Sequence, residues 1–503
     1  MKDSNALEYI RKESLDIYNR IHSIQEDVEF IRQVREEYSQ LPLLPNLRCG
    51  AWYTDPKIAT DIPAYFKSTD GHNNNWSFNL RRSNLHLIPF AIQHHGFILV
   101  DSTRSGKRIP DALSKTVPIW CSVINRAMKI RYPEMEVDNN PWDVGLFTPP
   151  NAVSLQEHHQ IELRLDRWAK DLADSSFELP RLPCPLRPLW ITPATSVFPS
   201  VPKITDSRSF LPVICVSASK QIDQGVERRH SGFSYIQGSG DDHELWGMGL
   251  TPKSFWRHRR EILEASRDTL PSLVSDLVRD ERTKPHTPAT NFTPSPIQKV
   301  SGRIRISTFE NLLSPTLAAD SISHMQIAYL VLTSQGDIKL GNSSNRLCLQ
   351  TLEGKKGQSQ LLHSILPQAM NFIEGNLKKG VDVCVACDTG KDLSVGVALV
   401  ALQQFFDDQG NFRVQGANMG EQCYLFCCVH WKTRKPSTEI TKRSIRTRLE
   451  WIIASRPQAN PSRNTLKKVN EYLLTPASFY TSNVDILTST CQTNVSCIPE
   501  VLE

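Results

Sequence analysis

The sequence of 503 residues has no long apolar run, no regular cysteine spacing and no basic, apolar start. No stretch of about 18 consecutive apolar residues occurs, so we expect neither a membrane-spanning helix nor a membrane partner. The chain begins with MKDSNALEYIRKES, which lacks the features of a signal peptide. The 12 cysteines follow no disulfide pattern, which is typical of a reducing cytosol. We therefore expect a cytoplasmic protein.

Internal repeats and low-complexity tracts are also lacking, and the composition is that of a globular protein. Hydrophobic residues make up 39% and charged residues 22%, and the length suffices for two or three domains. The Thr- and Pro-rich stretch at 283–296 is typical of a linker. We predict an N-terminal domain over 1–280, a linker over 281–300 and a C-terminal domain over 301–503. Nothing in the sequence implies an obligate protein partner.

The net charge of +5 is unevenly distributed along the chain. Residues 48–131 hold twelve Lys and Arg against five Asp and Glu, and residues 432–468 hold eleven against two. The first forty residues hold six against nine. Two basic tracts on a nearly neutral chain favour a polyanionic partner, above all nucleic acid. A solvated charged surface is the alternative.

The pattern of residues 381–405 predicts a strand, a polar turn and a helix. Val381, Val383 and Val385 are typical of a buried strand, and Ser394 is a natural N-cap for the apolar helix that follows. Loop N–H groups and a helix N-terminus together attract anions, and Lys391 adds a full positive charge. We name residues 387–394 the cradle and predict that it binds phosphate. A strand-turn-helix without a ligand is the alternative.

The cradle resembles the phosphate loop of dual-specificity phosphatases, in which a cysteine is followed after five residues by arginine and then Ser or Thr. Cys387, Gly390 and Ser394 match this pattern, but Leu393 stands at the arginine position. Without that guanidinium, no planar clamp holds a transferring phosphoryl group. The resemblance therefore implies a site that holds phosphate without cleaving it. An active phosphatase with Cys387 as nucleophile is a rival hypothesis.

The first basic tract combines cations with aromatic side chains. A predicted strand at 96–101 leads into a basic turn at 102–108, and Arg and Asn surround Trp76 and Phe78. Stacking side chains beside cations suit RNA, whose bases stack and whose phosphates pair with cations. The predicted tRNA-binding residues of the two basic tracts are Arg81, Arg82, Arg104, Lys107, Arg108, Lys442, Arg443, Arg446, Arg463 and Lys467.

An acidic turn at 238–244 carries three carboxylates and a histidine beside glycines. Oxygen ligands of this kind bind Mg²⁺, and a carboxylate can also act as a base. Asp241 and Asp242 are the candidate metal ligands. A solvated acidic turn is the alternative.

Five blocks resemble the fungal and plant initiator tRNA phosphoribosyltransferases: 76–82, 100–120, 240–246, 387–394 and 461–470. The resemblance implies transfer of 5-phosphoribosyl from phosphoribosyl pyrophosphate (PRPP) to the 2′-hydroxyl of adenosine 64. This adenosine lies in the T stem of initiator methionine tRNA, and the modification is expected to keep that tRNA out of elongation. The resemblance also implies a phosphatase-like last domain. An inactive phosphatase-like module that binds structured RNA is the alternative.

The reaction requires groups that hold the donor's phosphates, with Mg²⁺ on the pyrophosphate, and a base for the attacking hydroxyl. We assign the donor phosphate to the cradle. Asp388 and Asp392 are candidates for metal contact, ribose contact or the base, and Lys391 is counted with them as catalytic. The predicted phosphate-binding residues are Cys387, Thr389, Gly390, Lys391 and Ser394.

The expected fold class is α/β in both domains. The N-terminal domain is predicted as α/β or α+β with flanking helices, and the C-terminal domain as dual-specificity-phosphatase-like. The Pro-rich stretch at 179–212 is predicted as an irregular connection. Periodicity predicts helices at 6–38, 116–128, 153–175, 259–279, 363–379, 447–455 and 464–474.

Overall fold

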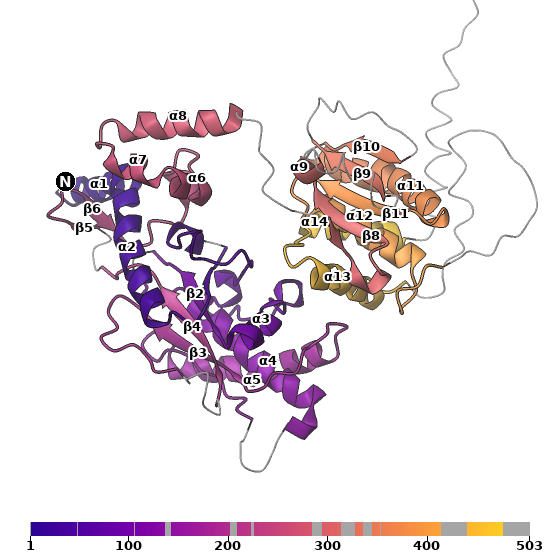
Figure 1. The fold of residues 1–503 in the computed structure, drawn as a ribbon, viewed down its shortest axis with the longest axis horizontal. Helices are drawn as coiled ribbons and strands as arrows, with labels where there is room; N and C mark the ends of the chain where they lie inside the picture. The colour runs from indigo at the N-terminus through magenta and orange to yellow at the C-terminus, as the bar shows by residue number, and fades with distance from the viewer. Residues whose placement is uncertain are drawn as a thin grey trace, which may run out of the picture. The chain divides into compact units, whose positions relative to one another are not determined.

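The computed structural model describes residues 2–475 apart from 48, 105, 136–141, 202–208, 223–225, 284–293, 313–326, 335–344, 353 and 414–439. The chain divides into two compact units, Met1–Thr287 and Pro288–Glu503, here named unit 1 and unit 2. The division falls inside the predicted linker at 281–300, of which residues 284–293 lie outside the described residues. Both units are α/β, as predicted, and Figure 1 shows strands accompanied by helices in each.

A parallel sheet of four strands forms the centre of unit 1, in the order β1-β2-β4-β3. Every residue of β2 and β4 is buried, as expected of central parallel strands. Because the strands are parallel, their carboxyl ends meet at one edge of the sheet. The strands of unit 1 are β1 (Leu43–Pro45), β2 (Phe97–Asp101), β3 (Leu186–Ile191) and β4 (Leu211–Ser217), with a separate hairpin of β5 (Val226–Arg228) and β6 (Ser234–Ile236).

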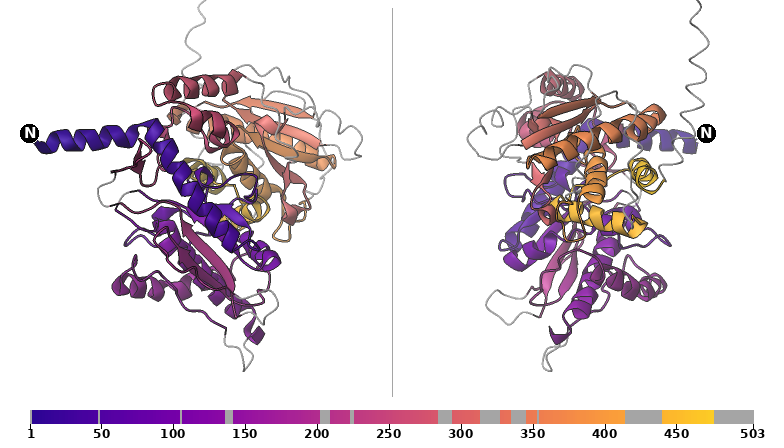
Figure 2. Two further views of the ribbon diagram at one scale, coloured as in Figure 1. Left: turned by 60° about the vertical axis from the view of Figure 1, so that its left-hand side comes forward. Right: turned by 90° about the vertical axis from the view of Figure 1, so that its right-hand side faces the viewer.

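One face of the sheet is covered by helix α2, which begins after its N-cap residue Asp16. The apolar side chains of α2 recur with helical spacing, and Ile21 and Ile24 share one core cluster with Ile98 and Ile214 of the sheet. Figure 2 (left) shows α2 running in roughly the same direction as the strands of the sheet. The helices of unit 1 are α1 (Lys2–Leu15), α2 (Ile17–Glu37), α3 (Leu87–His94), α4 (Val117–Arg131), α5 (Leu155–Ala173), α6 (Pro252–Arg257), α7 (Arg259–Glu264) and α8 (Leu270–Thr283).

Helix α4 lies on the opposite face. Cys121 of α4 is close to Cys215, whose side chain alternates along β4 with that of Ile214. Asn125 of α4 binds the edge strand twice, because its Nδ2 donates to Leu186 O and its Oδ1 accepts from Leu186 N, both at 2.9 Å. The predicted helices at 116–128 and 153–175 correspond to α4 and α5.

Two predictions for unit 1 are wrong. The stretch 179–212, predicted as irregular, contains β3 and the start of β4; Pro188 is tolerated because β3 is an edge strand. The predicted helix at 259–279 is interrupted between α7 and α8, where Ala265 is extended with φ −67° and ψ 141°. None of the described helices of the chain has the length and apolarity needed to cross a bilayer.

Unit 2 contains a sheet of five strands in the order β10-β9-β11-β8-β7, parallel except for the pair of β7 and β8. β11 is central and entirely buried, and its last residue, Cys387, lies opposite Thr308 of β8 and Leu332 of β9. The strand predicted at the start of the segment 381–405 is therefore confirmed. The strands are β7 (Ser295–Pro296), β8 (Ile304–Thr308), β9 (Ile327–Thr333), β10 (Arg346–Gln350) and β11 (Asp382–Cys387).

Helix α12 packs on β8 and β11 and also contacts α11, α13 and α14. Gly380, at φ +79°, follows the end of α11 and allows the chain to turn there. The helix predicted to start at Thr447 begins earlier, because Thr441 and Ser444 form a capping box. The helices of unit 2 are α9 (Phe309–Leu312), α10 (Gly354–Gln360), α11 (Leu366–Lys378), α12 (Leu393–Phe405), α13 (Lys442–Ser455) and α14 (Arg463–Leu474).

Candidate functional sites at two sheet edges

The cradle follows the carboxyl end of β11, as the sequence predicts. Cys387 is 3% exposed, and Gly390, at φ +61°, reverses the chain and donates its N–H to Cys387 O at 3.1 Å. Glycine is favoured here because most other residues are strained in this backbone conformation, and a Cβ would come within 2.9 Å of Ser307 O. Helix α12 then begins at Leu393, and the first N–H groups of a helix have no intrahelical acceptor. The segment therefore has the local structure expected of an anion site.

Ser394 does not cap α12, so this prediction is wrong. Asp392 occupies the N-cap position without a side-chain capping bond, and Ser394 lies inside the first turn. Ser394 is fully buried, with its Oγ 3.1 Å from Cys387 Sγ. The hydroxyl predicted to contact phosphate is thus already engaged with the thiol.

Sequence reasoning missed Arg456, which lies beside the cradle. Its Nε donates to Gly390 O at 2.8 Å, and its Nη1 donates to Ser295 Oγ at 2.9 Å. Burial lowers the pKa of Arg456, and the neighbouring Cys387 acts in the opposite direction. A guanidinium is therefore present, but it binds a loop carbonyl. It enters from a position 66 residues away in the chain, which no short motif reveals.

Both cradle aspartates accept hydrogen bonds from other segments. Asp388 Oδ2 accepts from the backbone N and the hydroxyl of Ser334, each at 3.1 Å. Asp392 Oδ1 accepts from Ser462 N at 2.8 Å. Asp388 is exposed and Asp392 half-buried, whereas Lys391 is exposed. One oxygen of each carboxylate thus holds the shape of the loop, which the sequence alone did not indicate.

The carboxyl edge of the unit 1 sheet carries a buried polar network. Asn46 Nδ2 donates to Asp101 Oδ2 at 2.8 Å, and Ser102 Oγ lies 2.7 Å from Ser219 Oγ. Ser219 Oγ in turn donates to Asp27 Oδ2 at 2.6 Å. The loops after β1, β2 and β4 are therefore joined to α2 by polar side chains. This network was not predicted, because its members are far apart in sequence.

Asp27 is a buried carboxyl group of this network. Burial raises the pKa of Asp27 to about 8, against the opposing effect of hydrogen bonds from the hydroxyls of Ser219 and Tyr235. Tyr235 OH donates to Asp27 Oδ1 at 2.7 Å. A protonated carboxyl group is consistent with this buried position, because burial disfavours its charged form.

Two of the five blocks named in the sequence analysis, 100–120 and 240–246, meet at this edge. Gly238, at φ +69°, lies so close to the first basic turn that a Cβ would come within 2.5 Å of Thr103 O. Arg104 pairs with both predicted metal ligands, at 3.4 Å from Asp241 Oδ2 and with a close contact to Asp242. In the described part of the chain, no three His, Cys, Asp or Glu side chains gather where they could hold a metal. Two carboxylates that face a guanidinium do not fit a protein-held Mg²⁺.

The next cation of the turn, Lys107, also has an acidic partner. Its Nζ lies 2.5 Å from Asp111 Oδ2, and the buried Lys115 lies 3.0 Å from the other oxygen of that carboxylate. Both lysines lower the pKa of Asp111, although burial acts against them. Trp76, predicted to stack on bases, is buried and donates its indole N–H to Glu157. The side chains of Trp76, Lys107 and Lys115 therefore contact other parts of unit 1 and stabilise its fold.

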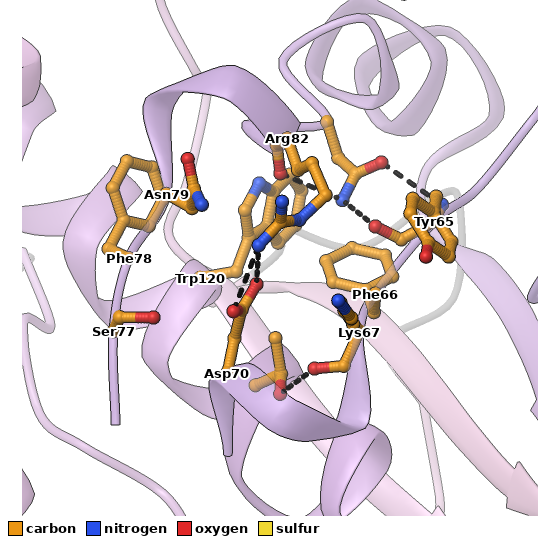
Figure 3. A pocket seen from close by; sticks show the side chains of 11 residues that line it. Tyr65, Phe66, Lys67, Asp70, Ser77, Phe78, Asn79, Arg82 and Trp120 are labelled. Atoms are coloured by element: carbon orange, nitrogen blue, oxygen red, sulfur yellow. Dashed lines mark hydrogen bonds and ion pairs between the residues drawn. The ribbon is translucent and has the colours of Figure 1, made fainter. Parts of the chain in front are cut away.

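Arg82 lines a small pocket of unit 1 and is paired within it. Its Nη2 donates to both oxygens of Asp70, at 3.0 and 2.9 Å. Figure 3 shows the two side chains pointing toward each other, with Phe66 and Trp120 nearby. The side chain of Arg82 is 14% exposed, so it is poorly placed to meet an RNA backbone. Arg81 is half-buried, and the carbonyl of Arg108 accepts from Ser217 Oγ.

The cations of the second tract are more accessible. Lys442, Arg443 and Arg446 are exposed on α13, whose first turn contains no acidic residue. Arg446 reaches Glu450 at 3.4 Å. Arg463 and Lys467 are exposed on α14, whose first turn also contains no acidic residue. Cations at a helix N-terminus are unfavourable unless an anion compensates them.

These features define a class of protein: two α/β units, one with a phosphatase-like loop that has Leu393 where such a loop carries its arginine. Residues 10–279 match the family model described as "Rit1 N-terminal domain", and residues 345–473 match the one described as "Rit1 DUSP-like domain". The chain belongs to the Rit1 family. Unit 2 thus has the dual-specificity-phosphatase-like fold that the sequence predicted.

Two relatives align over nearly the whole chain. One is the tRNA A64-2′-O-ribosylphosphate transferase of Saccharomyces cerevisiae, 30% identical over 92% of this chain and 93% of its own. The other is an uncharacterised protein of Schizosaccharomyces pombe, 31% identical over 95% of this chain and 98% of its own. Among solved structures, human DUSP28 matches at 10% identity and a TM-score of 0.23, over 35% of this chain and 90% of that chain.

Proposed function

We propose that this protein transfers 5-phosphoribosyl from PRPP to the 2′-hydroxyl of adenosine 64 in the T stem of initiator methionine tRNA. The observation that carries the proposal is the relative named for A64 2′-O-ribosylphosphate transfer, which aligns over both units. The five blocks that resemble the initiator tRNA phosphoribosyltransferases lie in those same two units: 76–82, 100–120, 240–246, 387–394 and 461–470. The modified tRNA would then serve initiation and be excluded from elongation.

The donor phosphate is assigned to the cradle. Lys391 supplies an exposed positive charge, and Thr389 and Gly390 supply the turn before the helix N-terminus. The hydroxyl of Ser394 contacts Cys387, so Ser394 contributes through its place in the first turn of α12. Cys387 shapes the loop, because no arginine in the loop completes a phosphatase site.

In the proposed reaction, the tRNA 2′-oxygen forms a bond to the anomeric carbon as the bond from that carbon to pyrophosphate breaks. The proton of the hydroxyl passes to a base, and pyrophosphate leaves with the electron pair. Each aspartate has one oxygen bound by a serine, Asp388 by Ser334 and Asp392 by Ser462. Asp388 is the preferred candidate for the base because it is exposed, whereas Asp392 is half-buried. Mg²⁺ would arrive on the pyrophosphate of the donor and keep water ligands.

The exposed cations of α13 and α14 are the preferred contacts to the tRNA backbone: Lys442, Arg443, Arg446, Arg463 and Lys467. In unit 1, Arg81 and Arg108 remain candidates. An A-form stem is recognised mainly through its shape and backbone, which suits such contacts. We further infer that the reaction takes place in the cytoplasm; the seven cysteines in the described part of the chain form no disulfide, which suits a reducing compartment.

The decisive experiment incubates the protein with PRPP labelled in its ribosyl phosphate and with total tRNA, and then maps the labelled nucleotide. We expect label at adenosine 64 of initiator tRNA and release of pyrophosphate. Binding of tRNA without consumption of PRPP would instead support the inactive RNA-binding module. Release of phosphate from a phosphorylated substrate would support the phosphatase hypothesis.

A further inference from the structure

One segment of unit 2 binds three consecutive residues of the cradle. We name residues 456–462 the brace. Arg456 Nε donates to Gly390 O at 2.8 Å, Asn460 N donates to Lys391 O at 3.0 Å, and Ser462 N donates to Asp392 Oδ1 at 2.8 Å. The brace thus binds the part of the cradle that precedes α12.

These contacts fix the direction of the loop amides. In a trans peptide group the C=O and the following N–H point in opposite directions. Because the carbonyls of Gly390 and Lys391 both point toward the brace, the N–H groups of Lys391 and Asp392 point away from it. The Lys391 N–H donates to Thr389 Oγ1 at 3.3 Å, so a ligand there would meet this amide together with the Thr389 hydroxyl. Successive amides that point to one side form an anion-binding nest. The brace therefore selects the loop conformation in which the Asp392 N–H, and the Lys391 N–H with its Thr389 partner, lie on the side away from the brace.

The sequence of the brace makes it suited to this role. Arg456 and Asn460 each precede a proline, and a proline restricts the preceding residue to extended conformations. Ala459 N donates to Arg456 O at 2.9 Å, which closes a turn between them. Arg456 is held at its other end by Ser295 Oγ. The donors are therefore pre-organised before any ligand binds.

We propose that Arg456 is a positioning residue that holds the cradle amides in place for a phosphate group of the donor. It acts from behind the loop, on the carbonyl side, and so differs from the loop arginine that clamps phosphate in a phosphatase. The part of the proposal that concerns the donor rests on the proposed function. The part that concerns the order of the loop does not.

The first test is amide hydrogen exchange of the full chain without ligand, followed by mass spectrometry. The variants are Arg456→Gln, which removes the charged donor, and Arg456→Lys, which keeps one. Lys378→Gln is the matched control, because Lys378 is exposed in the same unit and pairs only locally with Glu374. We expect faster exchange in peptides that cover 388–393 for Arg456→Gln, a smaller increase for Arg456→Lys and none for the control. Unchanged exchange in both Arg456 variants would overturn the proposal.

The second test is steady-state kinetics with PRPP and tRNA varied separately. Loss of a charge-assisted hydrogen bond weakens binding by about 10- to 100-fold, so the KM for PRPP should rise by that order in Arg456→Gln. The KM for tRNA should stay unchanged, and Arg456→Lys should recover part of the loss. A general structural defect would lower kcat and affect both substrates, which would overturn the positioning role. If the wild-type protein leaves PRPP intact, the proposed function fails, while the exchange experiment still decides whether the brace orders the loop.

Discussion

The two sheet edges of this protein use positive charge differently. At the edge of unit 1, Arg104 faces Asp241 and Asp242, and Lys107 faces Asp111. In unit 2, Lys391 is exposed, and α13 begins with cations and no acid. A count of charges along the chain gives both regions a similar excess. Only the structure separates cations that hold loops together from cations that remain accessible to a polyanion.

The largest effect is expected in unit 1, where Asp27→Asn should remove a pH dependence of stability. Burial raises the pKa of Asp27 from 3.8 to about 8, so the folded state keeps a proton that the unfolded chain has released. The stabilisation is complete below about pH 4 and is lost as pH rises to about 8. One pKa unit corresponds to about 1.4 kcal/mol, so the change amounts to several kcal/mol.

Urea unfolding at a series of pH values measures this dependence. The free energy of unfolding of the wild-type protein should decline between about pH 4 and pH 8, and the Asp27→Asn variant should show a flatter profile. Asp166→Asn is the control, since Asp166 is 88% exposed on α5. Parallel profiles for the wild-type protein and Asp27→Asn would show that Asp27 does not carry the effect.

The second effect concerns the cradle. Lys391→Ala should raise the KM for PRPP by about 10- to 100-fold, because a charged partner of the phosphate is lost. Affinity for tRNA, measured by filter binding, should remain the same, and Lys378→Ala should behave as the wild-type protein does. Equal losses for the two substrates would remove Lys391 from the donor site.

The smallest effect separates the two groups of cations by salt dependence. Each phosphate contact contributes about 0.9 to the slope of log affinity against log salt on duplex. The double variant Lys442→Ala with Arg443→Ala should therefore reduce the slope for tRNA by about 2. Arg104→Ala with Lys107→Ala should change the slope little, because carboxylates already balance these cations. A similar reduction in both variants would break the distinction between the two edges.

Local pattern predicted most of the secondary structure. The alternation of valines in β11 and the helical spacing of apolar residues in α2 depend on neighbours in the chain, so sequence alone revealed them. Strand β3 escaped prediction because Pro188 and its Pro-rich surroundings suggest irregular chain, whereas an edge strand tolerates proline. The early start of α13 was missed because its capping box precedes the apolar positions.

Partners distant in sequence could not be predicted. The contact of Arg456 with Gly390 spans 66 residues, and that of Asp27 with Tyr235 spans 208. The sequence correctly predicted a turn between the strand β11 and the helix α12, but it did not indicate that Asp392 binds Ser462 or that Ser394 binds Cys387. Those contacts depend on tertiary packing, which a motif does not encode.

Gly390 and Arg456 constrain each other's evolution. A Cβ on residue 390 would come within 2.7 Å of Arg456 Nη2 and 2.9 Å of Ser307 O, so even alanine would displace the guanidinium or the strand. Gly390→Ala and Arg456→Gln both disturb the contact between Arg456 and the loop. The loss of activity in the double mutant should therefore be smaller than the sum of the losses in the single mutants. A shorter side chain at 456 could not rescue alanine at 390, since φ +61° remains strained. The two positions therefore form an epistatic pair.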